Sequence, residues 1–281
     1  MSTRVSLNPL AKNTSTKIIA INSDNFNGNI NCLRNYLQQG HIIAIQECLL
    51  SPNSELYDKP EIAFDSDYAP INILDAEKSH VRDLSHHKFK KPGLMNFAKL
   101  VSRNLDEFNQ LVNDMKETER KVTAAAELLT GIKLICKSTW RYTSTRKTFY
   151  HLDDIKNCSP INIKCFWNLS DKPRRWSWGH LSNDIPKLCG KTYKEWYEAK
   201  GIENPAHNAF NRYLNSIMQD LERHEVSFGK YDLWFTDAQK TAHQCIAGNK
   251  VAVFDFYPHP SQNIYCSNYQ KLDYRRHIHI A

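Results

Sequence analysis

The segment 149–154 (FYHLDD) places a histidine and an aspartate two positions apart. Residues i and i+2 of a β-strand point to the same face, so His151 and Asp153 would direct an imidazole nitrogen and a carboxylate oxygen at one point. A second histidine from elsewhere in the chain would complete a set of two imidazoles and one carboxylate. Such a set covers one face of an octahedral metal ion and leaves other positions open, as in non-haem Fe(II) oxygenases.

The third ligand of such a site should come from a later strand that returns beside the first. His243 has the best position, because its segment 241–248 (TAHQCIAG) forms a predicted loop between two predicted strands. An exposed loop histidine is the alternative interpretation of His243. The other candidates for the third ligand are His180, His207, His224 and His259. His224 falls at a predicted helix end and His259 in a proline-rich exit from a strand, so both fit poorly.

Lys164 lies within the apolar strand predicted for 161–169 (INIKCFWNL). A buried lysine is costly unless it is paired, so an inward-facing Lys164 would call for an anion. The far carboxylate of a 2-oxo acid, placed in the same cavity as the metal, would satisfy that requirement. The alternative is that Lys164 lies on the solvent face of the strand.

The composition indicates a globular protein with a moderately basic surface. Lys+Arg number 37 against Asp+Glu 30, giving a formal net charge of +7 without any block of five or more basic residues. This balance favours a small or lipid-borne anion over nucleic acid as the partner, and a merely solvated basic surface is the alternative. Because there is no secretory signal, no run of 18 apolar residues and no C-x-x-C among eight cysteines, we expect a cytoplasmic protein with reduced thiols.

The periodicity of apolar residues predicts a helix-rich part over 17–131 and a strand-rich part over 132–260, within one domain spanning 1–281. Helices are predicted at 29–39, 97–116 and 122–129, and a helical insert at about 182–223. Strands are predicted at 17–21, 41–45, 133–136, 140–142, 149–153, 161–169, 230–236 and 249–257. Segment 51–93, which contains His80, His86 and His87, is predicted to be loop. The pattern favours an antiparallel barrel or sandwich with helices packed outside.

Several motifs together resemble the bacterial Kdo hydroxylases, which act on 3-deoxy-D-manno-oct-2-ulosonic acid (Kdo) in the inner core of lipopolysaccharide. The motifs are His151-x-Asp153, Phe166-x-Asn168, Pro173-Arg174-x-Trp176-x-x-Gly179, and Phe235-Thr236-Asp237 followed by His243-x-x-x-Ala247-Gly248. Segment 37–43 is also similar to the opening strand of that family. The resemblance covers most of the chain and is strongest from about 140 to 258.

The resemblance implies an α+β fold with a double-stranded β-helix (cupin or jelly-roll) core and buttressing helices. It implies Fe(II) held by His151, Asp153 and His243, and 2-oxoglutarate as cosubstrate, with Lys164 and Asn168 as its binding residues. The implied reaction is hydroxylation of C3 of Kdo on lipid A or a related acidic glycolipid, with contact at the inner face of an anionic inner membrane. Candidates for binding that substrate are Arg141, Arg146, Arg174, Arg175 and Trp176.

Departures from the family pattern affect the substrate more than the metal ligands. Lys164 stands where an arginine is expected, and a lysine lacks the bidentate fork of a guanidinium. His180 replaces an expected acidic residue, and two extra residues separate Asp237 from His243. Three alternatives therefore stay open: the same oxygenase chemistry on an amino acid, a peptide or another lipid; a binding barrel without metal; and a zinc hydrolase, for which no general base stands at a motif spacing.

Overall fold

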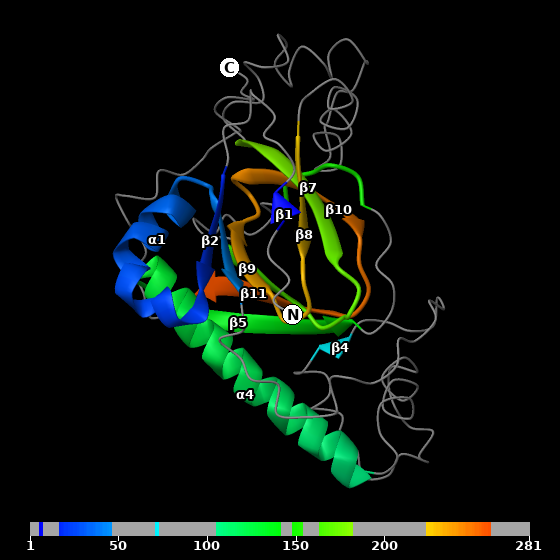
Figure 1. Cartoon of the computed structure of the whole chain (residues 1–281). Helices are drawn as coiled ribbons and strands as arrows, with labels where there is room; N and C mark the ends of the chain where they lie inside the picture. Colours follow the sequence, from blue (N-terminus) through cyan, green and yellow to red (C-terminus); the bar gives the residue numbers. More distant parts are fainter. Residues whose placement is uncertain are drawn as a thin grey trace, which may run out of the picture.

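The computed structural model describes residues 6–7, 17–46, 71–72, 105–141, 148–153, 163–181 and 223–259 (Figure 1). The strands are β1 (Ser6–Leu7), β2 (Ile18–Asn22), β3 (Ile42–Gln46), β4 (Ile71–Asn72), β5 (Leu134–Arg141), β6 (Ile163–Asn168), β7 (Arg174–Leu181), β8 (His224–Phe228), β9 (Leu233–Asp237), β10 (Thr241–Ala247) and β11 (Val251–Pro258). The helices are η1 (Ser23–Asn25), η2 (Asn27–Asn29), α1 (Ile30–Gln38) and α4 (Leu105–Thr130).

Two sheets build the core of the molecule. One has the strand order β1-β8-β7-β10, and the other has the order β2-β3-β9-β6-β11-β5-β4. Neighbouring strands are antiparallel except for the parallel pair β2–β3. Strands next to each other in the sequence, such as β6 and β7 or β9 and β10, belong to different sheets. This crossing between two facing sheets confirms the expected α+β architecture with a jelly-roll core.

Alternation along the strands of the larger sheet separates an inner face from an outer face. Phe166, Trp234 and Val253 lie on the inner face and pack against the smaller sheet. Their neighbours Trp167 and Phe254 point outward, into the core that the helices cover. We call the cluster between the two sheets the inner core and the cluster under the helices the outer core. Because the side-chain period of a strand is two, each of these strands can be apolar on both faces and is buried between two layers.

The outer face of the larger sheet is covered by α1 and α4, and α4 contacts β5 and β11 (Figure 1). Buried residues of α4 recur at three- and four-residue spacing and form one apolar stripe. That stripe consists of Phe108, Leu111, Met115, Val122, Ala125, Ala126 and Leu129. The expectation of helices buttressing a sheet is therefore confirmed.

The two helices predicted at 97–116 and 122–129 are one continuous helix, α4, over the part that the structure describes; residues 97–104 lie outside it. The prediction broke the helix at the polar run 117–121. In the structure Thr118 is 8% exposed and continues the buried stripe between Met115 and Val122, so the run only turns its charged members to solvent. The helix ends before Gly131, whose positive φ of 77° suits a glycine.

The strand predictions need further correction. Segments 133–136 and 140–142 are one strand, β5, and β7 and β8 formed where no strand was predicted. His224, predicted at a helix end, begins β8. Segment 149–153 forms only an isolated bridge at His151 instead of a full strand. The predicted helical insert 182–223 lies outside the described residues apart from Arg223, as does nearly all of 51–93 with its three histidines.

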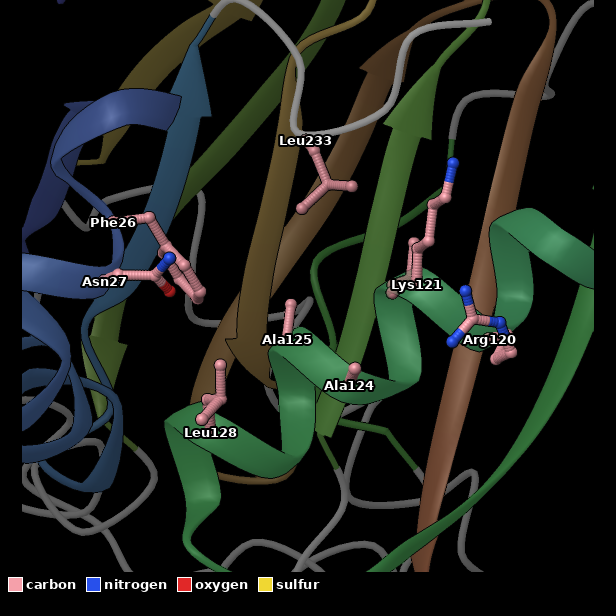
Figure 2. A pocket seen from close by; sticks show the side chains of 9 residues that line it. Phe26, Asn27, Arg120, Lys121, Ala124, Ala125, Leu128 and Leu233 are labelled. Atoms are coloured by element: carbon pink, nitrogen blue, oxygen red, sulfur yellow. The ribbon is translucent and has the colours of Figure 1, made fainter. Parts of the chain in front are cut away.

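A cavity of about 240 Å³ lies between α4 and the turn before α1 (Figure 2). Phe26 and Asn27 line one side, and Ala125 and Leu128 of α4 line the other. Leu233 of β9 also lines it and belongs to the outer core, so the cavity is on the opposite face of the larger sheet from the inner core. No described helix is long and apolar enough to span a lipid bilayer.

Asn168 joins the end of β6 to two neighbouring turns. It is fully buried, and its side-chain amide lies 3.0–3.3 Å from the carbonyl oxygens of Ser170, Lys172, Phe228 and Gly229. Its Oδ1 accepts the backbone N–H of Ser170 at 3.2 Å. These contacts satisfy the backbone of the turns on both sides of the residue, so the side chain stabilises the fold; its contact with a cosubstrate stays a prediction.

We expect Asn168→Ala to lower the free energy of unfolding by about 2 kcal/mol or more, because several buried carbonyls lose their donor. Chemical denaturation measures the loss. Asn109→Ala, at an exposed position of α4, is the matched control and should change stability little. Equal stability of the two variants would contradict this role for Asn168.

Candidate metal centre

Side chains of His151, Asp153 and His243 converge on one point between the two sheets. Each residue offers one ligand atom, and the three atoms lie within 4.8 Å of one another. The two imidazole ring centroids are 4.6 Å apart. No other described group of histidine, cysteine, aspartate or glutamate side chains comes together in this way.

Backbone pairing creates this convergence. The N–H of His151 donates to the carbonyl of His243 at 3.0 Å, and the N–H of His243 donates back to the carbonyl of His151 at 2.9 Å. The N–H of Asp153 then donates to the carbonyl of Ala238 at 2.9 Å. Directly opposed antiparallel residues place their side chains on the same face of a sheet, so the pairing sets both imidazoles side by side.

Segment 148–153 is fixed along the edge strand of the smaller sheet by Thr148. Its backbone N–H donates to the carbonyl of Cys245 at 3.0 Å, and its hydroxyl accepts the N–H of Cys245 at 2.9 Å. The side-chain amide of Gln244 donates to the carbonyl of Thr148 at 2.7 Å. Segment 148–153 therefore extends the sheet beyond β10, although it is too irregular to be a strand along its whole length.

Both imidazoles have the same orientation relative to the backbone. Nδ1 of His151 lies 2.7 Å from the carbonyl oxygen of Phe149, and Nδ1 of His243 lies 3.0 Å from that of Thr241. A carbonyl oxygen only accepts, so each Nδ1 is the protonated donor and each Nε2 keeps its lone pair. Nε2 of each ring is therefore the atom that can bind a metal ion. A histidine that binds a metal commonly donates its other ring N–H to a neighbouring oxygen in this way, which fixes the tautomer and the orientation of the ring.

His243 lies on β10 and is 4% exposed, where the sequence predicted a loop. The ring of Trp176 stacks on it, with centroids 5.1 Å apart and an interplanar angle of 14°. Trp176 is itself 1% exposed and packs edge-on against Phe166 and Trp234. Trp176, a candidate for binding substrate, therefore lies inside the core against one of the candidate metal ligands.

Burial and neighbouring charges set the protonation states at this point. Burial, aided by the neighbouring imidazole of His151, lowers the pKa of His243 to about 4. Burial would raise the pKa of Asp153, but the two neighbouring imidazoles and the ammonium of Lys164, 2.9 Å away, outweigh that effect and hold the pKa below its usual range. At neutral pH His243 is a neutral imidazole and Asp153 a carboxylate, the states in which both bind a divalent cation.

Lys164 faces the interior of the barrel and lies beside Asp153. Its ammonium is 2.9 Å from Oδ2 of Asp153 and 2.9 Å from Oδ1 of Asp255 on β11. Burial would lower the pKa of Lys164, but the two carboxylates outweigh that effect and raise it above its usual value. Sequence reasoning missed Asp255. The available signal was a lone carboxylate between Phe254 and Phe256 in a strand of otherwise apolar residues.

Comparisons with known proteins bear on the fold. No family model matches the sequence, and no curated protein sequence matches it. The crystal structure of the Kdo hydroxylase KdoO, a non-heme Fe(II) alphaketoglutarate-dependent dioxygenase, in complex with alphaketoglutarate and Fe(III), aligns with a TM-score of 0.56 and 15% identity over 86% of this chain and 89% of that chain. The two chains share a fold. The apo structure of the same hydroxylase aligns with a TM-score of 0.55 over the same shares.

Within the shared fold, the remaining candidate histidines lie apart from the metal-ligand group. His180 is buried on β7, with its Nδ1 3.3 Å from the hydroxyl of Tyr150. His224 packs against Trp178 at the start of β8, and His259 is exposed after β11. His207 lies outside the described residues.

Of the four arginines proposed to bind substrate, one is buried, one is on the surface, and the side chains of the other two lie outside the described part of the chain. Arg174 is 3% exposed and packs so closely on Gly248 that a Cβ there would lie 2.7 Å from its side chain. Arg175 is on the surface and pairs with Glu225 at 3.0 Å. Both therefore have structural partners. Arg141 ends β5, where only its backbone is described, and Arg146 lies outside the described residues.

Replacing Trp176 by leucine should weaken the binding of Co²⁺ by about ten-fold, because a residue that fixes a ligand's orientation typically contributes that much to metal affinity. Titration of the metal-stripped protein measures the dissociation constant. Trp140→Leu is the matched control, since Trp140 is equally buried but lies in the outer core. The control should lose stability without losing metal affinity, and equal dissociation constants for the two variants would contradict a role for the Trp176 ring.

The depressed pKa of His243 predicts how stability depends on pH. An unfolded chain takes up a proton at His243 near pH 6.5, whereas the folded chain does so only near pH 4. The contribution of the neutral imidazole is therefore complete above pH 6.5 and is lost as the pH falls towards 4. Denaturation of the metal-free protein across this range should show a shallower loss of stability for His243→Asn, and identical slopes would contradict the prediction.

Proposed function

We propose that the protein is an Fe(II)/2-oxoglutarate-dependent dioxygenase that hydroxylates an unactivated C–H bond. The observation that carries this proposal is the group of two imidazole nitrogens and one carboxylate oxygen within 4.8 Å of one another, inside a jelly roll. Two nitrogens and one oxygen from three side chains suit Fe(II) and leave positions for a chelating 2-oxo acid and O₂. The likeness in fold to an Fe(II)/alphaketoglutarate-dependent enzyme supports the same reading.

In this proposal each residue of the centre has a separate role. Nε2 of His151, Nε2 of His243 and Oδ1 of Asp153 hold the ion, which together with 2-oxoglutarate supplies the activation of O₂. Lys164 binds the distal carboxylate of 2-oxoglutarate. The ammonium of Lys164 faces Asp153 and Asp255 with two of its three N–H groups, and the third is the donor for the cosubstrate. The inner core around Phe166 and Trp234 keeps water from the buried side of the site.

For the substrate we propose the Kdo sugar of lipid A, hydroxylated at C3. Support comes from the combined motifs around His151, Asn168 and Trp176 and from the Kdo hydroxylase among the structures of the same fold. The formal charge of +7 suits a substrate that carries a carboxylate and phosphates. Because that substrate is an acidic glycolipid, the enzyme would work in the cytoplasm at the inner face of the inner membrane. Arg141 and Arg146 remain candidates for binding its anions.

The reaction class is tested by binding and turnover. Anaerobic addition of Fe(II) and 2-oxoglutarate should produce a weak visible charge-transfer band, and O₂ should then yield succinate. His151→Ala and Asp153→Ala should lower succinate formation by about 1000-fold or more, the range for deleting a group at the reacting centre. His259→Ala, an exposed histidine outside the site, is the control and should behave as wild type. No band and no succinate from the wild type would refute dioxygenase chemistry and favour a binding barrel.

The substrate is tested separately, by mass spectrometry of Kdo-lipid A after incubation with enzyme, Fe(II), 2-oxoglutarate and O₂. A gain of one oxygen that maps to C3 of Kdo is the expected result. Succinate formation without any change in Kdo would refute the substrate while leaving the reaction class intact. Amino acids, peptides and other lipids would then be assayed as substrates by the same gain of one oxygen.

A further inference from the structure

We propose that Asp255 is a positioning residue of the metal centre. Acting through Lys164, it holds Asp153 in the orientation that binds a divalent ion, and it supplies the negative charge that keeps the site attractive to that ion. The inference rests on the proposed function in one respect only, namely that His151, Asp153 and His243 bind a divalent metal.

Strand register brings Asp255 to the centre. Asp255 of β11 lies directly opposite Lys164 of β6 in the antiparallel pair, so the two side chains share the inner face. The preceding inward residues of β11, Val251 and Val253, belong to the inner core. A carboxylate that continues this apolar face is 19% exposed and needs a partner, which the ammonium of Lys164 provides at 2.9 Å.

The two oxygens of Asp153 are used differently. Oδ1 lies 3.5 Å from Nε2 of His151, on the side where the three ligand atoms converge. Oδ2 is buried and lies 2.9 Å from the ammonium of Lys164. Lys164 therefore keeps Oδ2 away from the ion and leaves Oδ1 as a single ligand atom. A lysine side chain has a flexible four-carbon stem, so a second anchor at Asp255 is what keeps its ammonium in this position.

Asp255 also strengthens metal binding through its negative charge. Without Asp255, the charges of Asp153 and Lys164 would cancel. A divalent ion would then bind at a site with no net negative charge and with an ammonium close by. With Asp255 the three side chains carry one net negative charge within a row of two 2.9 Å ion pairs. Opposite charge lowers the free energy of a bound cation most where water is scarce. Losing Asp255 therefore weakens metal binding through orientation and through charge.

A purely structural role for Asp255 predicts something else. If the residue only helps to pair β11 with β6, its loss lowers the stability of the protein and leaves the metal dissociation constant unchanged. If it positions the metal ligand, its loss raises that dissociation constant, and a substitution that keeps the carboxylate restores it. The two roles are separated by measuring metal affinity on folded protein without any turnover.

The experiment is a titration of metal-stripped, oxygen-free protein with Co²⁺, followed by its visible absorption. Asp255→Asn and Asp255→Ser should bind Co²⁺ about 10- to 100-fold more weakly than wild type, the usual effect of removing a partner of a metal ligand. Asp255→Glu should stay within about three-fold of wild type, because it keeps a carboxylate that can pair with Lys164. Asp171→Asn removes the same charge from an exposed turn, where Asp171 is 81% exposed and pairs with Lys230, and should bind as wild type.

Each outcome decides a different claim. Wild-type affinity in both neutral variants overturns the role of Asp255, and so does a loss in Asp255→Glu as large as the loss in Asp255→Asn. Because Asp255→Glu carries its own outcome, the proposal stays testable even where a neutral variant does not fold. A wild-type protein that binds no Co²⁺ overturns the metal centre itself. Tight Co²⁺ binding without succinate formation in the Fe(II) assay overturns only the dioxygenase reaction.

Discussion

Two reciprocal backbone hydrogen bonds between His151 and His243 are the constraint on which the centre depends. They join residues that are far apart in the sequence, and they fix both the distance and the common face of the two imidazoles. The jelly roll makes the pairing available, because it returns β10 beside the segment that follows β5. Asp153 is placed by the same segment through one further backbone bond to Ala238. The geometry of the ligands is thus a property of strand pairing, which side chains then refine.

The interior between the sheets changes character along the strands of the larger sheet. Around Phe166 and Trp234 it is a stack of aromatic rings, in which the ring centroids of Trp234 and Phe228 are 3.8 Å apart. Two residues along β6 it becomes an ionic row of Lys164, Asp255 and Asp153. The aromatic end supplies the burial that stabilises the barrel, and the ionic end places charged groups beside the point where His151, Asp153 and His243 converge. Trp176 joins the two ends, because it packs in the aromatic stack and covers one face of His243.

Sequence patterns predicted the three side chains that converge in the structure, because the chemistry of each side chain is local. His151 and Asp153 follow from a spacing of two, and an inward Lys164 follows from a lysine within an apolar strand. His243 was the best candidate by order along the chain, yet it was expected in a loop, since polar Gln244 and small Ala242 obscure the alternation of β10. Asn168 and Trp176 were expected to touch ligands because the family motif contains them. Their contacts show that a motif residue can equally serve a turn or a core.

The register between paired strands could not be predicted from the sequence. β7 was missed because Arg174 and His180 occupy two of its buried positions and interrupt the apolar alternation. β8 does alternate, with His224, Val226 and Phe228 buried, but it is only five residues long and directly follows a segment predicted to be helical. The function of Asp255 depends wholly on facing Lys164 across β11 and β6, and no spacing along the chain encodes that pairing. The same holds for the merging of two predicted helices into α4, where Thr118 faces the core despite its charged neighbours.

Three side chains joined by strand pairing form one metal site if a crystal structure of the protein, loaded with Mn²⁺ under anaerobic conditions, shows the ion between them. Anomalous scattering locates the ion without reference to any assay. We expect a single strong peak within about 2.0–2.3 Å of Nε2 of His151, Oδ1 of Asp153 and Nε2 of His243, the usual range for nitrogen and oxygen ligands. A peak elsewhere, or none between these three atoms in a protein soaked with excess metal, would contradict it.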